Sequence, residues 1–398
     1  MTQLKILIEY YHKNILENLV APLGTRPDIL MFYYDPAFFT VSAVYDTFLV
    51  CKKYIPHAKL EVGTYHVNDF RQIKEKLAQY IEENPKDELT VDLSGAKELG
   101  AAAAYELSLH SKLDLIYTDI RNFRIFSIRY HNRRYPCQKI SVEDIIEAVG
   151  GKVIYCADSS YLDGCKKDFL PVAQKLVRDA DLWFQICQFL QRNGKHDGKD
   201  RLHFSASYRE NVKVHNAVLE GDIFEFFADH HLIRNLHKDE ETLSFTYRDK
   251  ICMHALTTFG TWLELLVYYA MKESKKFYDV RNSMEIDWNR KDKYQNVGNE
   301  IDVTAMYGCV PVVISCKMSE KSTDADALNE LYTVSHRMSR GHVVRVLVTY
   351  SKIKKKKTMI YLKAKEMGII VLDEIDIKSE NFTKRLENEI CDGSWIIR

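Results

Sequence analysis

The sequence predicts an α/β protein with more than one domain. Three observations lead to this prediction. In the first 125 residues, short runs rich in β-branched and aromatic residues alternate with runs of helical spacing, the pattern of a parallel sheet covered by helices. The last third of the chain again mixes helices and strands around an antiparallel hairpin. The length of 398 residues, 46% of them hydrophobic, exceeds what one ordinary core requires.

The first region is predicted to contain four strands joined by helices. Strands are expected at 4–11, 28–35, 59–67 and 88–95, and helices at 43–54 and 69–83. Since a helix crosses over the sheet between consecutive strands, the strands should lie parallel and the helices should cover both faces. In such sheets, ligands bind at the carboxyl ends of the strands.

The turn after the fourth strand is the best candidate for an anion site. "DLSGAKELGAAAAYE" places Ser94 and Gly95 in a small turn, and Lys97 begins an alanine-rich helix whose free N–H groups favour an anion. The pattern is neither a P-loop nor the glycine fingerprint of dinucleotide-binding proteins. The alternative is an ordinary strand-to-helix turn with a solvated lysine.

Aromatic and polar residues follow the first two strands. Tyr11 and His12 leave the first strand, and Tyr34 and Asp35 leave the second. Such residues could stack on bases and bind ribose hydroxyls. The alternative is that they pack in the core or at its edge, because function in such a fold is argued from the site and not from the fold.

The middle of the chain is predicted to be a connector. Pro136 breaks regular structure near a domain boundary, and Ser141 with Asp144 forms the start signal of a helix. One long helix is expected over 170–193, and a helix, a short hairpin and a second helix over 226–256. The last three elements are the outline of a winged helix.

The stretch "GNEIDVTAMYGCVPVVISCK", residues 298–317, is predicted to form a hairpin with its turn near Gly308. Strands 300–306 and 310–317 then pair so that Asp302 faces Ser315 and Glu300 faces Lys317. Because side chains alternate between the faces of a strand, the two acids and the lysine gather at one end of one face.

Two carboxylates beside a lysine suit metal-assisted hydrolysis of a phosphodiester. Mg²⁺ and Mn²⁺ prefer oxygen ligands and activate a bound water. A lysine can orient that water or stabilise the developing charge. The alternative is a purely structural hairpin with a cross-strand ion pair between Glu300 and Lys317.

Composition and charge narrow the class of protein. The net charge is zero, so a nucleic acid would be attracted only by a local patch, such as the lysine run Lys352 and Lys354 to Lys357. The chain has no apolar stretch of membrane-spanning length, no secretory signal pattern, and nine cysteines without a C-x-x-C pair. We therefore expect a cytoplasmic protein with reduced thiols and no membrane contact.

"NEID" followed by an apolar strand that ends in lysine resembles the PD-(D/E)XK nuclease superfamily, and "TFGTWLELLVYYAM" resembles the helix that precedes this hairpin. The resemblance covers residues 250–375. It implies that Lys317, Asp302 and Glu300 are catalytic, and that Asp302, Glu264 and the carbonyl of Cys316 hold Mn²⁺ or Mg²⁺. Ser315 stands where the superfamily has an acid, which weakens the implied metal site.

The whole chain resembles the CRISPR ancillary nucleases that join an N-terminal CARF domain to such a nuclease domain. This implies a Rossmann-like CARF domain over 1–135, a helical and partly winged-helix-like connector over 136–250, and a restriction-endonuclease-like α/β domain over 251–398. It further implies a homodimer in which a cyclic oligoadenylate, such as cyclic tetra-adenylate, switches on cleavage of DNA or RNA, with the connector transmitting the signal. The implied ligand-binding residues are Ser94, Gly95, Ala96, Lys97, Tyr11, His12, Tyr34 and Asp35.

Two other functions stay open on the sequence. In the first, the protein is a ligand-responsive regulator that binds DNA through the winged-helix-like segment and cleaves nothing. In the second, it is a restriction or repair nuclease that needs no activator.

Overall fold

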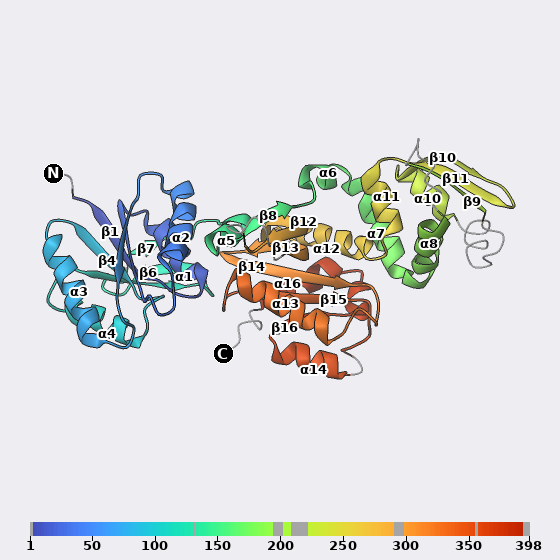
Figure 1. The fold of residues 1–398 in the computed structure, drawn as a ribbon. Coiled ribbons are helices and arrows are strands. Elements are labelled where there is room, and N and C mark those ends of the chain that lie inside the picture. Colours follow the sequence, from blue (N-terminus) through green and yellow to red (C-terminus); the bar gives the residue numbers. More distant parts are fainter. Residues whose placement is uncertain are drawn as a thin grey trace.

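A computed structural model describes residues 3–130, 132–193, 202–207, 222–289, 298–354 and 357–392. Three sheets lie within this part of the chain. Figure 1 shows an N-terminal domain, a C-terminal domain beside it, and a lobe on the far side of the C-terminal domain. None of the described helices is long and apolar enough to cross a bilayer.

The N-terminal domain is built on a seven-stranded sheet of order β3-β2-β1-β4-β5-β6-β7. The strands are β1 (Lys5–Tyr10), β2 (Ile29–Tyr34), β3 (Lys59–Thr64), β4 (Glu88–Asp92), β5 (Asp114–Asp119), β6 (Arg124–Ser127) and β7 (Arg134–Tyr135). The helices are α1 (Ile15–Thr25), α2 (Val41–Tyr54), α3 (Phe70–Glu83) and α4 (Glu98–Ser108). The first five strands are parallel, so the four predicted strands and their parallel pairing are confirmed.

Both faces of this sheet are covered, as predicted. Leu7 on β1 belongs to the same buried cluster as Leu16 of α1 and Phe48 of α2. The next residue, Ile8, points to the other face and belongs to a second cluster with Leu77 of α3. Successive side chains of a strand point to opposite faces of the sheet. A strand in which successive residues are all apolar is therefore typical of a sheet that is buried on both faces.

The C-terminal domain is built on a six-stranded sheet of order β16-β15-β14-β13-β12-β8. The strands are β8 (Lys152–Tyr155), β12 (Phe277–Asp287), β13 (Gly298–Tyr307), β14 (Val310–Lys317), β15 (Val344–Thr349) and β16 (Ile369–Leu372). The helices are α12 (Thr261–Glu273), α13 (Ala325–Met338), α14 (Met359–Glu366), α15 (Glu374–Ile377) and α16 (Phe382–Cys391). Strands β12 to β14 are antiparallel, and β14 to β16 are parallel.

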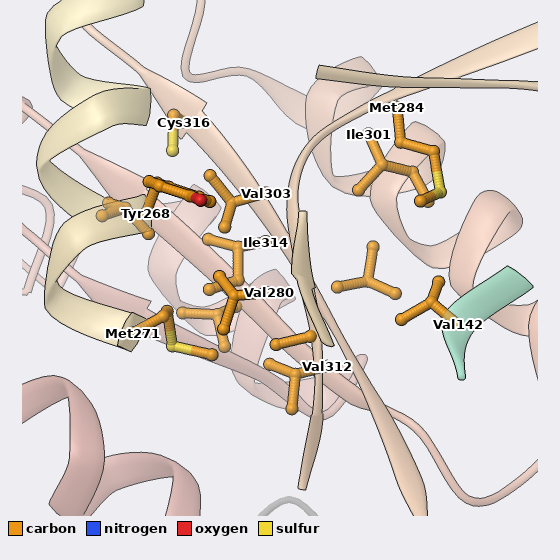
Figure 2. Packing of buried hydrophobic residues seen from close by; sticks show 14 of the residues in the cluster. Val142, Tyr268, Met271, Val280, Met284, Ile301, Val303, Val312, Ile314 and Cys316 are labelled. Atoms are coloured by element: carbon orange, nitrogen blue, oxygen red, sulfur yellow. The ribbon is translucent and has the colours of Figure 1, made fainter. Parts of the chain in front are cut away.

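Helix α12 covers one face of this sheet. Figure 2 shows Tyr268 and Met271 of α12 against Val280, Val303 and Ile314 of the three antiparallel strands, in a core that excludes water. Removing such apolar surface from water stabilises the fold by roughly 25 cal/mol for each Å². Helix α13 packs against β14 and β15.

A strand from the middle of the chain completes the C-terminal sheet. Helix α5 (Val142–Ala148) starts at Ser141, which forms the predicted capping box with Asp144, and packs against α2. Strand β8 follows and pairs with β12, placing Tyr155 beside Glu285. The predicted domain boundaries at 135 and 250 stay predictions, although the C-terminal sheet reaches outside its predicted range.

The lobe contains the predicted helix, hairpin and helix. It consists of α6 (Ser159–Gly164), α7 (Lys166–Arg178), α8 (Ala180–Asn193), β9 (His203–Ser207), α10 (Ile223–Asp229), β10 (Ile233–Lys238), β11 (Thr242–Tyr247) and α11 (Lys250–Thr257). The prediction of one long helix over 170–193 is wrong. Asp179 ends α7, and its carboxylate accepts a hydrogen bond from the Leu182 amide at 3.2 Å, which starts a second helix.

The lobe does not stand between the two domains. In Figure 1 it extends beyond the C-terminal sheet, on the side away from the N-terminal domain. The role of the connector as the transmitter stays a prediction: its α5 packs against α2 and its β8 pairs with β12, and the two domains also contact each other directly.

Candidate active site and ligand pocket

The hairpin register is the predicted one. Val303 pairs with Ile314 and Thr304 with Val313, and the same register continued by one residue sets Asp302 across from Ser315. Gly308 has φ of +60° in the connecting turn, a conformation that glycine adopts without strain. The turn therefore fixes which side chains meet at the other end of the hairpin.

Asp302 is held at the end of the hairpin by the facing strand. Its Oδ2 accepts a hydrogen bond from the Cys316 amide at 2.6 Å and one from the Ser315 hydroxyl at 3.4 Å. The Ser315 side chain and the Cys316 amide thus position Asp302.

A cavity of approximately 130 Å³ opens beside this end of the hairpin. It is lined by the predicted residues Glu300, Asp302 and Lys317, together with Ser315. Glu330 of α13 also lines it, although the sequence analysis did not select this residue. In the sequence, Glu330 stands out only as a polar residue beside the apolar Leu331 on an amphipathic helix. This pattern does not distinguish a residue that lines a cavity from one that is exposed to solvent.

The acidic residues at this end of the hairpin interact electrostatically with Glu264 of α12, which does not itself line the cavity. Burial first, and then the charges of Asp302 and Glu300, raise the pKa of Glu264 to about 8, against a smaller lowering by Lys317. Burial likewise raises the pKa of Asp302 and of Glu300, and Lys317 lowers both. These three carboxyl groups disfavour one another's ionisation. A divalent cation bound among them would reduce this electrostatic repulsion.

The donors present fit a hard cation. Carboxylates of Asp302 and Glu264 and a main-chain carbonyl are the oxygen ligands that Mg²⁺ and Mn²⁺ prefer. Within the described ranges, no three His, Cys, Asp or Glu side chains are gathered as a ready-made metal site. Cys316 lies on the α12 face of its strand (Figure 2), and burial raises the pKa of its thiol well above the usual range, so only its carbonyl is a candidate ligand.

A larger hollow lies at the carboxyl ends of the N-terminal strands. It comprises two adjoining cavities of approximately 660 and 260 Å³. Both are lined by Tyr11, His12, Lys13, Phe38, Phe39 and Arg340. Of the eight predicted ligand residues, the hollow is lined by Tyr11, His12, Asp35, Gly95 and Lys97. Ser94, Ala96 and Tyr34 line neither cavity.

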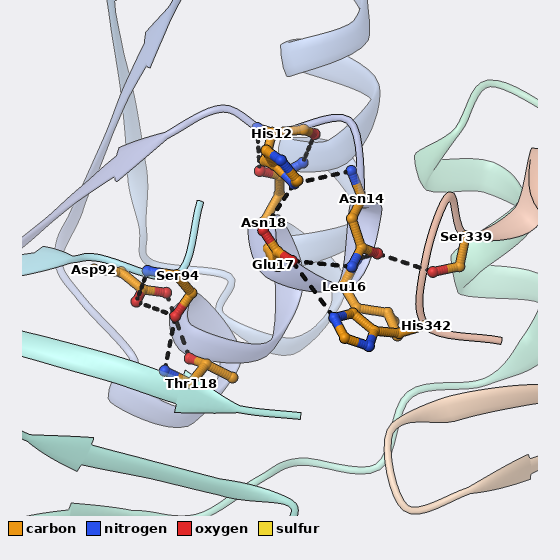
Figure 3. Close-up of polar contacts among 10 residues, drawn as sticks. All are labelled: His12, Asn14, Leu16, Glu17, Asn18, Asp92, Ser94, Thr118, Ser339 and His342. Carbon is orange, nitrogen blue, oxygen red and sulfur yellow. Dashed lines mark hydrogen bonds and ion pairs between the residues drawn. The ribbon is translucent and has the colours of Figure 1, made fainter. Parts of the chain in front are cut away.

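The turn after β4 is built to approach β1 closely. The Ser94 hydroxyl donates to Asp92 at 2.6 Å and accepts from the Thr118 amide at 2.7 Å, so it points into the sheet (Figure 3). A Cβ on Gly95 would lie 2.4 Å from the Tyr10 carbonyl oxygen, so this contact requires glycine. Lys97 is exposed, with its ammonium 5.2 Å from the centre of the Phe38 ring.

Asp35 and Tyr11 have structural partners. The Asp35 carboxylate accepts hydrogen bonds from the amides of Ala37 at 2.9 Å and Val67 at 2.8 Å, which ties two strand-end loops together. The buried Tyr11 hydroxyl bonds to the Thr47 hydroxyl at 2.9 Å and donates to a main-chain carbonyl of α2. Both residues shape the hollow more than they offer free polar groups to it.

Polar contacts join the two domains beside the hollow. The ring of His12 pairs with Glu17 at 2.7 Å, and Glu17 faces His342 of the C-terminal domain at 3.5 Å (Figure 3). The Ser339 hydroxyl donates to the Asn14 side chain at 2.9 Å. His12 is therefore a link to the C-terminal domain as well as a lining residue.

An aromatic contact joins the domains at the hairpin. Phe123, in the turn between β5 and β6, meets Tyr307 edge to face with ring centres 5.2 Å apart. The same ring fills the space over Gly308, where a Cβ would lie 2.1 Å from it. The N-terminal domain thus touches the turn of the hairpin whose other end carries Asp302 and Lys317.

The predicted basic patch is only partly described. Lys355 and Lys356 lie outside the described residues. Lys352 pairs with Glu374 at 3.2 Å, and Lys354 pairs with Asp376 at 2.9 Å. These two lysines are partly neutralised by local acids, which reduces their attraction for a phosphate backbone.

The C-terminal part of the chain matches a known protein family, and the whole chain resembles solved structures. Residues 253–389 match the family described as "Card1-like, endonuclease domain". No curated protein sequence matches the chain. Among solved structures, protein VC1899 from Vibrio cholerae is similar with a TM-score of 0.76 and 14% identity, over 98% of each chain.

Two further structures are similar. Can2 from Sulfobacillus thermosulfidooxidans, in complex with cyclic tetra-adenylate, has a TM-score of 0.68 and 14% identity, over 98% of this chain and 97% of that one. A type III CRISPR defence DNA nuclease activated by cyclic oligoadenylate has a TM-score of 0.51 and 13% identity, over 88% of this chain and 47% of its own. The matches to VC1899 and Can2 span both domains and confirm the predicted fold and architecture. The match to the Card1-like endonuclease domain, over residues 253–389, contains the hairpin with Asp302 and Lys317.

Proposed function

We propose that this protein is an endonuclease of type III CRISPR antiviral defence that cleaves DNA or RNA when a cyclic oligoadenylate, such as cyclic tetra-adenylate, binds its N-terminal domain. The observation that carries the proposal is the placement of the Card1-like match on the hairpin with Asp302 and Lys317, in a chain whose other domain has a large hollow lined by cations and aromatic rings. The Can2 structure, which shares the fold over both domains, contains cyclic tetra-adenylate.

Cleavage would take place at the end of the hairpin that carries Asp302 and Lys317. Asp302, Glu264 and the Cys316 carbonyl would hold Mg²⁺ or Mn²⁺, which supplies an activated water and neutralises charge on the scissile phosphate. Lys317 stabilises the negative charge that develops during cleavage. Glu300, whose pKa is raised by burial, can take up a proton at its carboxylate.

The activator would bind across the hollow. Phe38 and Phe39 offer faces on which bases stack, and Lys13 and Lys97 offer cations for phosphates. Lys97 also starts α4, whose first amides have no side-chain cap.

We further propose that the protein acts as a homodimer in the cytoplasm. A near-symmetric cyclic tetranucleotide suits a two-fold pocket made from two copies of one hollow. An exposed apolar stripe lies next to the hollow, formed by Phe38, Val41, Tyr45 and Leu49, with exposed fractions of 62%, 54%, 53% and 46%. Exposed stripes of this kind are typical of protein interfaces.

The test is a cleavage assay on the purified full chain. Labelled single-stranded DNA, supercoiled plasmid and RNA are incubated with Mg²⁺, Mn²⁺ or EDTA, with and without cyclic tetra-adenylate. We expect cleavage only when metal and activator are both present. Cleavage without activator would favour an activator-independent nuclease, and activator binding without any cleavage would favour a regulator.

Variants locate the active site. Asp302→Asn and Lys317→Ala should each reduce cleavage by about 100-fold or more, since a charged group aimed at the reacting atoms is lost. Lys365→Ala is the matched control, because Lys365 is an exposed lysine of α14 in the same domain. Activator binding should be equal in all three variants. Retained cleavage in Asp302→Asn or Lys317→Ala would place the active site elsewhere.

A further inference from the structure

Two arginines of the C-terminal domain line the hollow of the N-terminal domain. Arg337 lies in the last turn of α13, and Arg340 follows that helix by two residues. Arg337 lines the larger cavity, and Arg340 lines both. Both side chains are exposed to solvent. The hollow is therefore shared by the two domains.

The segment that carries Arg340 is held against the N-terminal domain on both sides. Ser339 donates to Asn14 at 2.9 Å, and His342 faces Glu17 at 3.5 Å. The Gly341 amide closes a tight turn on the Ser339 carbonyl at 2.8 Å. Arg340 projects from a short segment whose two ends are anchored, which reduces the entropy that the side chain would lose on binding a ligand.

The charges around this segment favour an anion. His12, Lys13 and Lys97 line the hollow from the N-terminal domain, in addition to the two arginines. Two acids also line it, Asp35 and Asp46, and Asp35 is already bound by two main-chain amides. Burial, followed by the charges of Arg345, Arg340 and Lys13, lowers the pKa of the neighbouring His336, as expected in a positive environment.

We propose that Arg337 and Arg340 bind phosphate groups of the activator, so that the ligand is held by both domains at once. This inference rests on the proposed function, because it assigns additional binding residues to the same activator. A guanidinium suits the role, since its planar donors can pair with two phosphate oxygens.

The same helix reaches the proposed active site. Glu330 of α13 lines the cavity beside Asp302 and Lys317, and Arg337 lines the hollow. Arg337 is the seventh residue after Glu330, which corresponds to about 10 Å along the helix at 1.5 Å for each residue. A ligand that holds Arg337 and Arg340 therefore fixes the position of a helix that borders the catalytic cavity, which gives activation a direct route between the domains.

The experiment measures the affinity of the full-length protein for cyclic tetra-adenylate. Arg340→Ala, Arg337→Ala and the double variant are compared with the wild type and with the control Lys365→Ala by isothermal titration calorimetry. Each single variant should bind about 10-fold more weakly, since a charge-assisted hydrogen bond is lost, and the double variant more weakly still. Arg340→Lys should recover part of the loss. Melting temperatures equal to that of the wild type show that the variants are folded.

The outcomes separate this inference from the proposed function. A wild-type protein that neither binds nor is activated by cyclic tetra-adenylate overturns both. A wild-type protein that is activated, with arginine variants that bind as tightly as the control, overturns the inference alone. Variants that bind normally but are no longer activated also overturn it, because the arginines then act without contacting the ligand.

Discussion

Replacement of Glu17 by glutamine tests whether the polar contact between the domains stabilises the protein. The Glu17 side chain is only 14% exposed and faces His12 at 2.7 Å and His342 at 3.5 Å. Burial raises the pKa of its carboxyl group, but the hydrogen bonds from the two histidines outweigh burial and lower the pKa from 4.5 to about 2. The folded protein therefore favours the ionised form of Glu17 over the protonated form.

The size of the effect follows from this pKa difference. A difference of about 2.5 pKa units, at 1.36 kcal/mol for each, corresponds to about 3 kcal/mol of stability. Because the pKa is lower in the folded state, this stability is fully present above pH 4.5 and is lost as the pH falls toward 2. Glu17→Gln should thus be less stable than the wild type by up to about 3 kcal/mol near neutral pH, and the gap should close in acid.

Urea unfolding at a series of pH values, from about 7 down to about 3, measures this gap from the free energy of unfolding. The matched control is Glu82→Gln, since Glu82 is an exposed glutamate of α3 in the same domain. A Glu17→Gln protein as stable as the control at every pH would refute the reasoning. A gap that widens on acidification would refute it as well, because it would mean that burial dominates.

Three further predictions concern the hollow and the hairpin. Gly95→Ala should weaken activator binding by 10-fold or more, on the order of 1.4 kcal/mol. The added Cβ would lie 2.4 Å from the Tyr10 carbonyl oxygen, so the turn must move. Calorimetric titration measures the affinity, and an unchanged affinity would contradict this prediction. Gly308→Ala should lower the free energy of unfolding by about 1–3 kcal/mol, because residue 308 has φ of +60° and a Cβ there would collide with the Phe123 ring. Urea unfolding measures this free energy. A variant as stable as the wild type would argue against the contact between Phe123 and Gly308. Lys97→Ala should raise the activator concentration for half-maximal cleavage about 10-fold with an unchanged melting temperature, and an unaltered activation curve would remove Lys97 from the site.

Local patterns were sufficient to predict the hairpin and the first four strands of the N-terminal sheet, but not β5, β6 and β7. A glycine in a short turn fixes the register of two strands, and this register alone brings Asp302 to Ser315. Likewise, the four N-terminal strands are short apolar runs separated by helical runs. In both cases the signal lies within a few neighbouring residues of the chain.

Contacts between distant segments were not predictable in this way. Glu330 and Arg340 reach their cavities because α13 packs across the sheet at a particular angle, and a single sequence carries no direct signal of that angle. The inward direction of the Ser94 hydroxyl depends on Asp92 and on the amide of Thr118 in the adjacent strand. The site residues that the sequence analysis missed come from α13 and the segment after it, and also from the loops after β1 and β2, which supply Lys13, Phe38 and Phe39.

The pairing of β8 with β12 makes the lobe an insertion within the C-terminal domain. The chain leaves the C-terminal sheet after β8 and returns to it through α12 and β12, so both ends of the lobe meet at one edge. An exchange of the outer part of this insertion need not alter the strand register, provided that α7 is kept, because α7 packs on α12 with Phe169 against the buried Trp262. A fragment that began at residue 251 would instead lack its outer strand, leaving the amides and carbonyls along β12 as an unpaired edge open to aggregation.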